Sequence, residues 1–410
     1  MKNFWNNVGD KLFSKITVGN LTIHYDDGTQ KSYGQTATPK ATLHLKNANL
    51  FKNVALYGDI GFAESYMDGD FECDDLTAFT LIALQNSKAL ETKSEDSKLF
   101  SLNNLLPWFN RAKHLLRRNS KANAKRNIAE HYDLSNEFFK LMLDETMMYS
   151  SAVFQNPSTS LYQAQCEKID RLAKKLNLKS GDEVLEIGSG WGEVSLHLTQ
   201  KYGCKVKTLT LSEEQKKLCE EKFVKNEIGD SVEVLLKDYR DMEGKFDAII
   251  AVEMFEAVGE QYFDIFFKKC ESLLKPSGVL VMQIITVPAQ RYESYASGTD
   301  FIRKYIFPGG HLPSISKILA VNEKHTNLDL HHLEDFTEHY AKTLNLWRES
   351  FEANLDKTRE LGFDERFIRM WRIYLEFCEA AFLARTINLT QIVLTRYENM
   401  ALNEGLIECA

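Results

Sequence analysis

A short apolar run followed by a glycine-rich turn constrains the fold of this 410-residue chain more than any other feature. Val184, Leu185 and Ile187 form the run, which suits a strand buried on both faces of a parallel sheet. The turn at residues 188–192 reads GSGWG, and helical spacing of apolar residues resumes after it until a second apolar run at 206–211. The stretch therefore predicts a βαβ unit whose turn lets a ligand approach the backbone closely.

The spacing of these glycines favours one kind of ligand. The pattern is Glu-x-Gly-x-Gly-x-Gly, and its acid, Glu186, lies inside the end of the strand. Dinucleotide-binding turns instead read Gly-x-Gly-x-x-Gly with an acid about 20 residues later, and a P-loop needs a Gly-Lys-Ser/Thr sequence that is missing here. The turn therefore predicts a nucleoside-type cofactor without a pyrophosphate, and S-adenosylmethionine (SAM) fits best.

Composition excludes several classes of protein. A hydrophobic content of 44% and a charged content of 26% are ordinary for a soluble globular protein, and the length predicts two or more domains. No apolar run reaches the roughly 18 residues of a transmembrane helix. The 7 cysteines are scattered without C-x-x-C spacing, which favours reduced thiols in the cytosol and disfavours a zinc site. The net charge of −8 disfavours a general nucleic-acid binder.

The first part of the chain, residues 1–95, predicts a small α+β domain. Strand-like runs at 21–25 and 41–45, with a turn sequence at 26–28 between them, resemble a hairpin, and residues 53–82 have helical character in parts. Two interpretations of this domain stay open. It is either a structural appendage or a lipid-handling or dimerising module.

Residues 96–127 form the predicted linker to the next domain. An apolar cluster, LLPWF at 105–109, precedes seven lysines and arginines between 111 and 126, with no acid among them. An interfacial membrane anchor needs this combination, because the rings enter the headgroup layer and the cations meet anionic lipid. A solvated, charged linker is the alternative interpretation.

The remaining residues, 128–410, predict a catalytic domain of α/β type. Apolar runs at 232–236, 246–252 and 279–285 continue the pattern of buried strands. The acid Glu256 follows the second of these runs, at the carboxyl edge where ligands bind in doubly wound sheets. We interpret Glu256 as a catalytic or binding residue, with a surface acid as the alternative.

A strongly apolar cover is predicted for this domain. Residues 301–313 combine apolar side chains with tight-turn residues, and we interpret them as a pocket wall within a lid around 290–350. Residues 340–396 are rich in aromatic side chains and are predicted to be helical. A small polar substrate does not require so apolar a cover, whereas a long acyl chain does.

Eight motifs, taken in order, carry a family resemblance: GFAESYMDGDFEC (61–73), HYDLSNEFFKLMLDETMMYSSAVF (131–154), VLEIGSGWG (184–192), TLTLSEEQ (208–215), DYRDM (238–242), MFEAVG (254–259), KYIFPGGHLPS (304–314) and RMWRIYLEFCEAAFLARTINLTQIVLTR (369–396). The set resembles the cyclopropane-fatty-acid synthase and mycolic-acid cyclopropane synthase family of SAM-dependent methyltransferases. The resemblance runs from about residue 53 to residue 396, and the ordered set is highly specific. It implies that the chain adds a carbon from SAM across or beside the double bond of an unsaturated phospholipid acyl chain.

The resemblance also implies which residues bind SAM. Tyr149 and Ser150 would close over the cofactor. Its methionine and ribose would be cradled by Glu186, Gly188, Gly190, Trp191 and Gly192. The ribose and adenine would be lined by Thr210, Leu211 and Gln215, and the adenine would be flanked by Tyr239 and Arg240.

Three further residues are implied at the reaction centre. The family binds a bicarbonate ion near the reacting carbon through a glutamate and a tyrosine that match Glu256 and Tyr340. Cys378 matches a cysteine that is often named as an active-site residue. Because alkene attack on a sulfonium methyl needs no thiolate, a buried cysteine that only packs is the alternative.

The chain departs from the family pattern where the product is decided. The usual Tyr-Ser-Cys is Tyr149, Ser150 and Ser151, and the usual histidine after Lys-Pro-x-Gly is Gln283. We place Gln283 in the catalytic set, since a glutamine still donates to an anion, although it cannot shuttle a proton near neutral pH. SAM binding and methyl transfer are therefore predicted, and ring closure is the open step.

The sequence thus predicts an α/β fold: a doubly wound, Rossmann-like sheet of the class I SAM-dependent methyltransferases with helical cap insertions, plus a small N-terminal α+β domain. The predicted product is a cyclopropane fatty acid; a methyl-branched or methylene chain, small-molecule methylation, and a non-catalytic lipid-binding or SAM-sensing role are alternatives. We expect a cytoplasmic enzyme, peripheral on the inner face of the membrane, with no nucleic-acid partner. A homodimer is one option, as is a downstream reductase if the product is a methylated chain.

Overall fold

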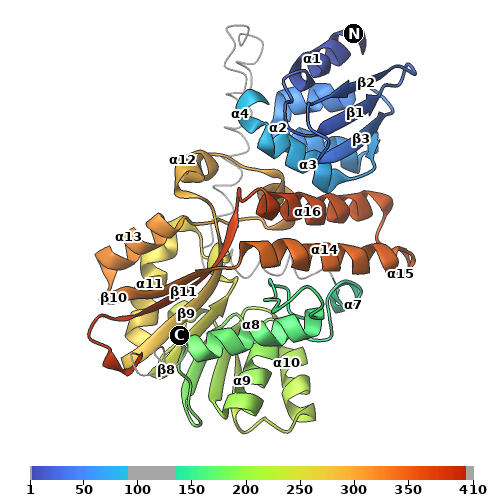
Figure 1. The fold of residues 1–410 in the computed structure, drawn as a ribbon. Helices are drawn as coiled ribbons and strands as arrows, with labels where there is room; N and C mark the ends of the chain where they lie inside the picture. Colours follow the sequence, from blue (N-terminus) through green and yellow to red (C-terminus); the bar gives the residue numbers. More distant parts are fainter. Residues whose placement is uncertain (1, 91–134, 403–410) are drawn as a thin grey trace. The chain divides into compact units, whose positions relative to one another are not determined.

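The computed structural model describes residues 2–90 and 135–402, which form two compact units that the chain enters more than once (Figure 1). The four-stranded unit contains residues 2–90, 294–308 and 344–387. The seven-stranded unit contains residues 135–293, 309–343 and 388–402. Two segments that we expected in one C-terminal domain therefore group with the N-terminal residues. The linker predicted at 96–127 lies outside the described residues, together with its apolar and basic run.

The four-stranded unit is built on a small mixed sheet. Its strands are β1 (Asn20–His24), β2 (Gln30–Tyr33), β3 (Lys40–Leu45) and β4 (Phe71–Cys73), in the order β2-β1-β3-β4. The hairpin predicted between residues 21–25 and 41–45 is wrong, because β1 and β3 are parallel and β1 forms its hairpin with β2. The sequence QKSY of β2 is polar and mostly exposed, so this edge strand lacks the apolar alternation that would have announced it.

Helices complete this unit, and α2 and α3 pack against its sheet. They are α1 (Lys2–Phe13), α2 (Asn49–Met67), α3 (Leu76–Gln85), α4 (Ser87–Leu90), α15 (Leu355–Glu360) and α16 (Glu365–Leu383). Helix α16 packs against α3 and α2 although it is distant from them in sequence. Arg369 of α16 pairs with Glu72 at 2.9 Å, and Thr77 donates a hydrogen bond to Glu379 at 3.3 Å.

The seven-stranded unit has the doubly wound sheet that the sequence predicted. Its strands are β5 (Glu183–Ile187), β6 (Lys205–Thr210), β7 (Val232–Leu236), β8 (Phe246–Val252), β9 (Leu274–Thr286), β10 (Leu328–Asp335) and β11 (Asn388–Arg396). They follow the order β10-β11-β9-β8-β5-β6-β7, in which β5 to β9 are parallel and β11 is antiparallel to both neighbours. The order reverses between β5 and β8, where ligands bind in such sheets.

Two hydrophobic cores flank this sheet, because its central strands are buried on both faces. Along β8, Ala248 and Ile250 face one core, and Ile249 and Ala251 face the other. The helices of the unit are α7 (Asn136–Lys140), α8 (Leu161–Lys175), α9 (Glu193–Tyr202), α10 (Glu213–Lys225), α11 (Phe263–Leu273) and α13 (Ile315–His325). Helices α8, α9 and α10 cover one face, and α11 and α13 cover the other (Figure 1).

Two predictions about the later part of the chain need correction. Residues 388–396 are strand β11 and not helix, since β-branched and apolar residues fill a central position between β9 and β10. The region around 290–350 is not a lid alone. It contains α12 (Ala289–Ser297), a π-helical turn (Ile302–Ile306), α13, strand β10 of the sheet and the start of α14 (Thr337–Ala353).

No helix in the part of the chain that the structure describes is long and apolar enough to cross a bilayer.

Candidate active site

The glycine-rich turn joins β5 to α9 at the carboxyl edge of the sheet. Its glycines all have positive φ angles: 98° at Gly188, 49° at Gly190 and 84° at Gly192. A Cβ atom at Gly192 would lie 2.9 Å from the ring of Phe223, so this position requires glycine for space as well as for conformation. At Gly190 a Cβ would meet nothing within 4 Å, which leaves an open approach to the backbone. The turn therefore fits a cofactor that lies against the main chain.

Glu186 lies directly before this turn and is buried, with 2% exposure. The hydroxyl of Ser195, on α9, donates a hydrogen bond of 2.5 Å to its carboxylate. Burial raises the pKa of Glu186 to about 7, and the hydrogen bond from Ser195 opposes this rise. The group therefore changes charge close to neutral pH, where an ionised carboxylate attracts the positive charges of SAM.

The residues predicted to surround the ribose and adenine follow the next two strands. Thr210 ends β6 and donates to the amide oxygen of Gln215 at 2.8 Å. Leu211 follows Thr210 directly, and Ser212 caps α10 by accepting from the backbone of Gln215. All of them lie at the carboxyl end of β6, beside the glycine-rich turn, because β5 and β6 are parallel neighbours. The predicted ribose contacts are thus brought together.

The predicted adenine contacts, Tyr239 and Arg240, lie in a short 3-10 helix (Tyr239–Asp241) after β7. The guanidinium of Arg240 holds both carboxylate oxygens of Asp238, at 2.8 and 2.6 Å. It also lies 5.6 Å from the ring of Tyr239 and 5.4 Å from that of Tyr262. The bidentate ion pair with Asp238 fixes Arg240. The flat ring faces of Tyr239 and Tyr262 are then the elements that would recognise an adenine.

An aromatic cluster supports the segment that is predicted to close over SAM. The ring of Phe139 lies 5.2 Å from both the ring of Tyr149 and that of Trp191, and Trp191 donates to Asn136 at 2.9 Å. Helix α7 therefore ties Tyr149 to the glycine-rich turn. Sequence reasoning interpreted this stretch as pocket cap or core, and its rings fulfil a structural role here.

A fully buried lysine anchors the same segment from the other side. Lys168 of α8 is 0% exposed, and its ammonium donates to the hydroxyl of Ser150 and to the side chain of Gln165, each at 2.6 Å. Gln165 in turn donates to the backbone carbonyl of Ser150 at 3.0 Å. Burial lowers the pKa of Lys168 to about 8, although the nearby carboxylate of Glu253 favours its charged form.

Glu253 is the centre of the polar contacts at the end of β8. Its carboxylate accepts three hydrogen bonds: from the hydroxyl of Tyr340 at 2.7 Å, from the amide of Gln283 at 2.8 Å and from the backbone of Ser151 at 2.9 Å. Its φ angle of 49° is unusual for a residue other than glycine. Strained backbone of this kind persists where surrounding contacts determine it and is concentrated at functional sites.

Glu256 lies one turn further along, in a 3-10 helix (Phe255–Ala257). Its Oε1 accepts from the backbone of Ile285 at 2.5 Å, whereas Oε2 is buried and has no hydrogen-bond partner among the described residues. Burial, and then the negative charge of Glu253, raise the pKa of Glu256 to about 8. Burial also raises the pKa of Glu253, but Tyr340, Gln283, Lys168 and Ser151 oppose the rise. The three donors favour the charged form of Glu253, whereas Glu256 accepts only from a backbone amide and is the acid with the weaker support for a negative charge.

This arrangement bears on the bicarbonate ion implied by the family resemblance. The hydroxyl of Tyr340 and the amide of Gln283 donate to Glu253, and neither donates to Glu256. An additional anion would lack these donors and would lie beside two carboxyl groups. The described residues therefore do not fit a bicarbonate ion, and no chemical step is assigned to one.

Cys378 belongs to the four-stranded unit, in α16, whereas Glu253, Tyr340 and Gln283 belong to the seven-stranded unit. Burial raises the pKa of the Cys378 thiol far above its usual range. It is therefore a neutral thiol at physiological pH, and a thiolate role is not supported.

Sequence reasoning missed Glu253 and Lys168. A signal for Glu253 was present, because it is the first residue after the buried strand 246–252, but the match to the family's glutamate directed attention to Glu256. No signal marked Lys168, which occupies an ordinary position in an amphipathic helix and is recognised only by its burial.

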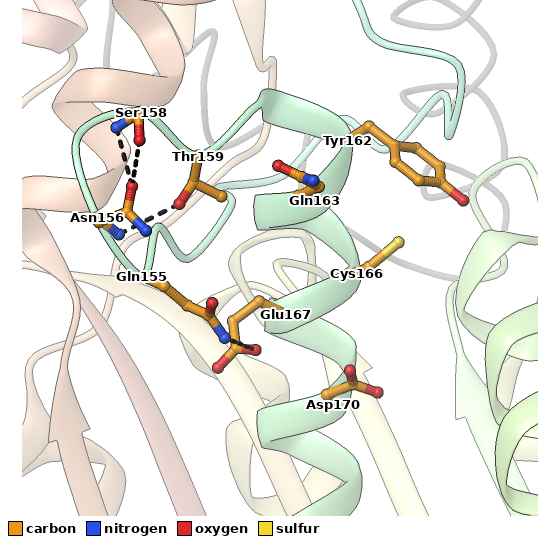
Figure 2. A pocket seen from close by; sticks show the side chains of 9 residues that line it. All are labelled: Gln155, Asn156, Ser158, Thr159, Tyr162, Gln163, Cys166, Glu167 and Asp170. Carbon is orange, nitrogen blue, oxygen red and sulfur yellow. Dashed lines mark hydrogen bonds between the residues drawn. The ribbon is translucent and has the colours of Figure 1, made fainter.

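A separate polar pocket of about 400 Å³ lies beside α8 (Figure 2). The loop before the helix contributes Gln155, Asn156, Ser158 and Thr159, and the helix contributes Tyr162, Gln163, Cys166, Glu167 and Asp170. Figure 2 shows Gln155 turned toward Glu167, to which it donates at 2.7 Å. The lining contains none of the residues discussed above as SAM-binding or catalytic, so we do not assign this pocket to the reaction.

The sheet order, the glycine-rich turn at the carboxyl end of β5 and the acid inside that strand define a class I SAM-dependent methyltransferase. The family model of mycolic acid cyclopropane synthetase matches residues 119–392, and the chain belongs to this family. A second model, a domain of unknown function (DUF7884), matches residues 8–94. The prediction of the family, the fold class and the cofactor SAM is confirmed.

Relatives with named functions align with most of the chain. Tuberculostearic acid methyltransferase of Mycobacterium tuberculosis is 38% identical over 383 residues, which are 92% of this chain and 88% of the relative. Cyclopropane-fatty-acyl-phospholipid synthase of Escherichia coli is 36% identical over 356 residues, 87% of this chain and 88% of that protein. The solved structure of mycolic acid cyclopropane synthase complexed with SAH and CTAB has a TM-score of 0.62 and 31% identity, covering 66% of this chain and 98% of its own. The chain is therefore an enzyme that methylates or cyclopropanates fatty acyl chains with SAM.

Proposed function

We propose that this enzyme transfers the methyl carbon of SAM to the double bond of an unsaturated acyl chain in a membrane phospholipid and closes a cyclopropane ring. The observation that carries the proposal is the carboxylate of Glu253, which is fixed by three donors next to the segment 149–151. A base in that position lies beside the residues expected to close over the methyl donor. It is therefore suited to remove a proton from the methyl group after transfer.

The chemistry places two demands on the protein. When bound, SAM supplies an electrophilic methyl group on a sulfonium sulfur. The π electrons of the alkene form the new carbon–carbon bond as the carbon–sulfur bond breaks, which leaves a carbocation in the acyl chain. The carboxylate of Glu253 takes a proton from the new methyl group, and the electron pair of that C–H bond closes the ring. Water must be excluded until then, because it would trap the cation.

The two glutamates have different roles because they differ in charge. We propose that Glu253, whose carboxylate holds three hydrogen-bond donors, carries the negative charge and accepts the proton. Glu256 is protonated near neutral pH and adds no second negative charge that would compete for the proton. We propose that the carboxylate of Glu253 serves in place of the bicarbonate ion that the family resemblance implies.

A methyl-branched or methylene chain is a second candidate product. Gln283 stands where the family has a histidine and cannot carry a proton, and a relative at 38% identity is named for tuberculostearic acid. In that case the cation migrates or loses a proton without ring closure, and a reductase is needed downstream for a saturated methyl branch.

We further propose that the enzyme acts at the cytoplasmic surface of a membrane. The apolar and basic run at 105–126, which lies outside the described residues, has the composition of an interfacial anchor. Replacing Arg117, Arg118, Lys125 and Arg126 by glutamine is expected to reduce co-sedimentation with anionic phospholipid vesicles, and the wild-type binding should weaken with salt. Equal co-sedimentation of the variant and the wild type would remove this part of the proposal. Homodimer formation stays a prediction.

The test of the reaction is lipid analysis of cells that express the chain and are fed methionine with a trideuterated methyl group. Ring closure yields acyl chains that gain one carbon, keep two deuterons, resist mild hydrogenation and show cyclopropyl proton signals by NMR. Two deuterons with a remaining double bond indicate a methylene product, and three deuterons indicate loss of a chain proton. Either result overturns ring closure but supports methyl transfer to an acyl chain, whereas unlabelled lipids overturn both.

A further inference from the structure

A row of polar side chains crosses the seven-stranded sheet from its edge to Glu253. Glu334 of β10 is paired in register with Gln391 of β11, and Gln391 is paired with Gln283 of β9. Gln391 and Gln283 are both 0% exposed. Polar side chains buried in a sheet interior are costly unless every donor and acceptor is satisfied, so a row of this kind calls for an explanation.

From Lys175 to Glu253, the hydrogen bonds along this row run in one direction. The ammonium of Lys175, in the last turn of α8, donates to the amide oxygen of Gln391 at 2.5 Å. The amide nitrogen of Gln391 donates to the amide oxygen of Gln283 at 2.9 Å. The amide nitrogen of Gln283 then donates to Glu253 at 2.8 Å and to the backbone carbonyl of Ser151 at 3.1 Å.

The lysine sets this direction because it has hydrogen-bond donors and no acceptor. Gln391 must turn its oxygen to the lysine, which leaves its nitrogen for Gln283. Gln283 must then turn its oxygen to Gln391, which leaves its nitrogen for Glu253. If Gln283 were reversed, its oxygen would face the carboxylate of Glu253, and two acceptors would be in contact.

We infer that Lys175 and Gln391 are positioning residues, which act through Gln283 to hold a hydrogen-bond donor on the reactive carboxylate of Glu253. The inference rests on the proposed function of Glu253 as proton acceptor. It adds two residues to those assigned a role at the site above, and both reach Glu253 only through Gln283. Glu334 completes the row by pairing with Lys175 at 2.6 Å, which compensates the charge of the partly buried ammonium.

The decisive variant is Gln391→Glu. A carboxylate at this position still accepts from Lys175 but has no proton to donate, so Gln283 is expected to reverse and direct its oxygen to Glu253. Glu253 then loses a donor and faces an acceptor, and its pKa rises by about one unit or more. Lys175→Met is the second variant, because it removes the group that sets the direction. Arg171→Met is the matched control, since Arg171 also binds Glu334, at 3.2 Å, but does not contact the two glutamines.

Two readouts separate this inference from the proposed function. The first is the infrared band of the protonated carboxyl of Glu253, assigned by its loss in Glu253→Gln and followed against pH. Among the described residues, the other ionisable groups near Glu253 are Glu256, Lys168 and Tyr340, and all are retained in each variant. The second is the pH profile of kcat/KM, whose acidic limb is expected to shift upward with the infrared midpoint. The infrared titration remains valid even if no acyl chain is methylated, so a failure of the proposed function is recognised separately.

The expected result is an upward shift of about one unit or more in Gln391→Glu and Lys175→Met and no shift in Arg171→Met. SAM affinity should be retained in all three, which verifies the fold. If Gln391→Glu no longer binds SAM, the infrared midpoint of Lys175→Met becomes the test of the inference. An unchanged midpoint in a folded Gln391→Glu, or an equal shift in Arg171→Met, would overturn the inference.

Discussion

The stability of the seven-stranded unit should depend on pH through Glu256, and the effect can be worked out from the structure. Burial and the neighbouring Glu253 raise the pKa of Glu256 from 4.5 to about 8. Between these values the unfolded chain has released the proton and the folded chain still holds it. The folded state therefore binds more protons, and the free energy of unfolding falls as pH rises through this window.

Each pH unit in this window corresponds to about 1.4 kcal/mol, so the whole window corresponds to about 5 kcal/mol. The variant Glu256→Gln keeps an oxygen for the backbone of Ile285 but does not titrate. Relative to the wild type, it is expected to gain about 2.7 kcal/mol between pH 5.5 and pH 7.5. The other ionisable groups are present in both proteins, so their contributions to the free energy of unfolding cancel in the difference. This includes Glu253, because residue 256 is neutral in both proteins over this pH range.

The measurement is urea unfolding at the two pH values without SAM, with hydrogen exchange of peptides from β8 and β9 as the probe. This probe reports the seven-stranded unit by itself, which is necessary because a chain with two units need not unfold in one step. A difference between variant and wild type that stays constant within about 0.5 kcal/mol would show that Glu256 ionises at its ordinary pH. The assignment of Glu256 as the protonated partner would then be wrong.

Three further predictions address the site. Glu253→Gln is expected to keep SAM affinity and lower kcat by about 10²- to 10⁴-fold, because it removes the proton acceptor; single-turnover rates near those of the wild type would refute this. Lys168→Met is expected to weaken SAM binding about tenfold in calorimetry by releasing Ser150, with the exposed Lys174→Met as control, and equal affinities would assign Lys168 to stability alone. SAM affinity is expected to rise with pH through about 7, as Glu186 ionises; a Glu186→Gln variant with the same pH dependence would contradict that origin.

The part of the fold that could be predicted is the part encoded by local patterns. The run at 184–187 and the turn at 188–192 specify a buried strand and a tight backbone in any context, and they identified the cofactor class. Strand β11 could not be identified in the same way. Its sequence follows a long aromatic helix, and it becomes a strand because β9 and β10 provide partners on both sides.

The candidate site was predicted in its residue types but not in its pairing. Tyr340 and Gln283 were both expected near a reactive anion, and both donate to a carboxylate. The acid that they contact is Glu253, a residue with a left-handed backbone conformation. A single sequence does not reveal a backbone conformation of this kind. Only the structure could therefore show which of the two acids, Glu253 or Glu256, the donors contact.

The four-stranded unit also has a consequence for how the protein is made. Its helices α2 and α3 leave the ribosome early, but α16, which packs on them, is synthesised about 300 residues later, as the 302-residue separation of Thr77 and Glu379 illustrates. During translation the apolar faces of α2 and α3 therefore lack their partner while β5 to β10, all strands of the other sheet except β11, emerge. Such long-range closure is slow and leaves apolar surface open to aggregation. An expression fragment that ends near residue 95 would carry that exposed surface permanently.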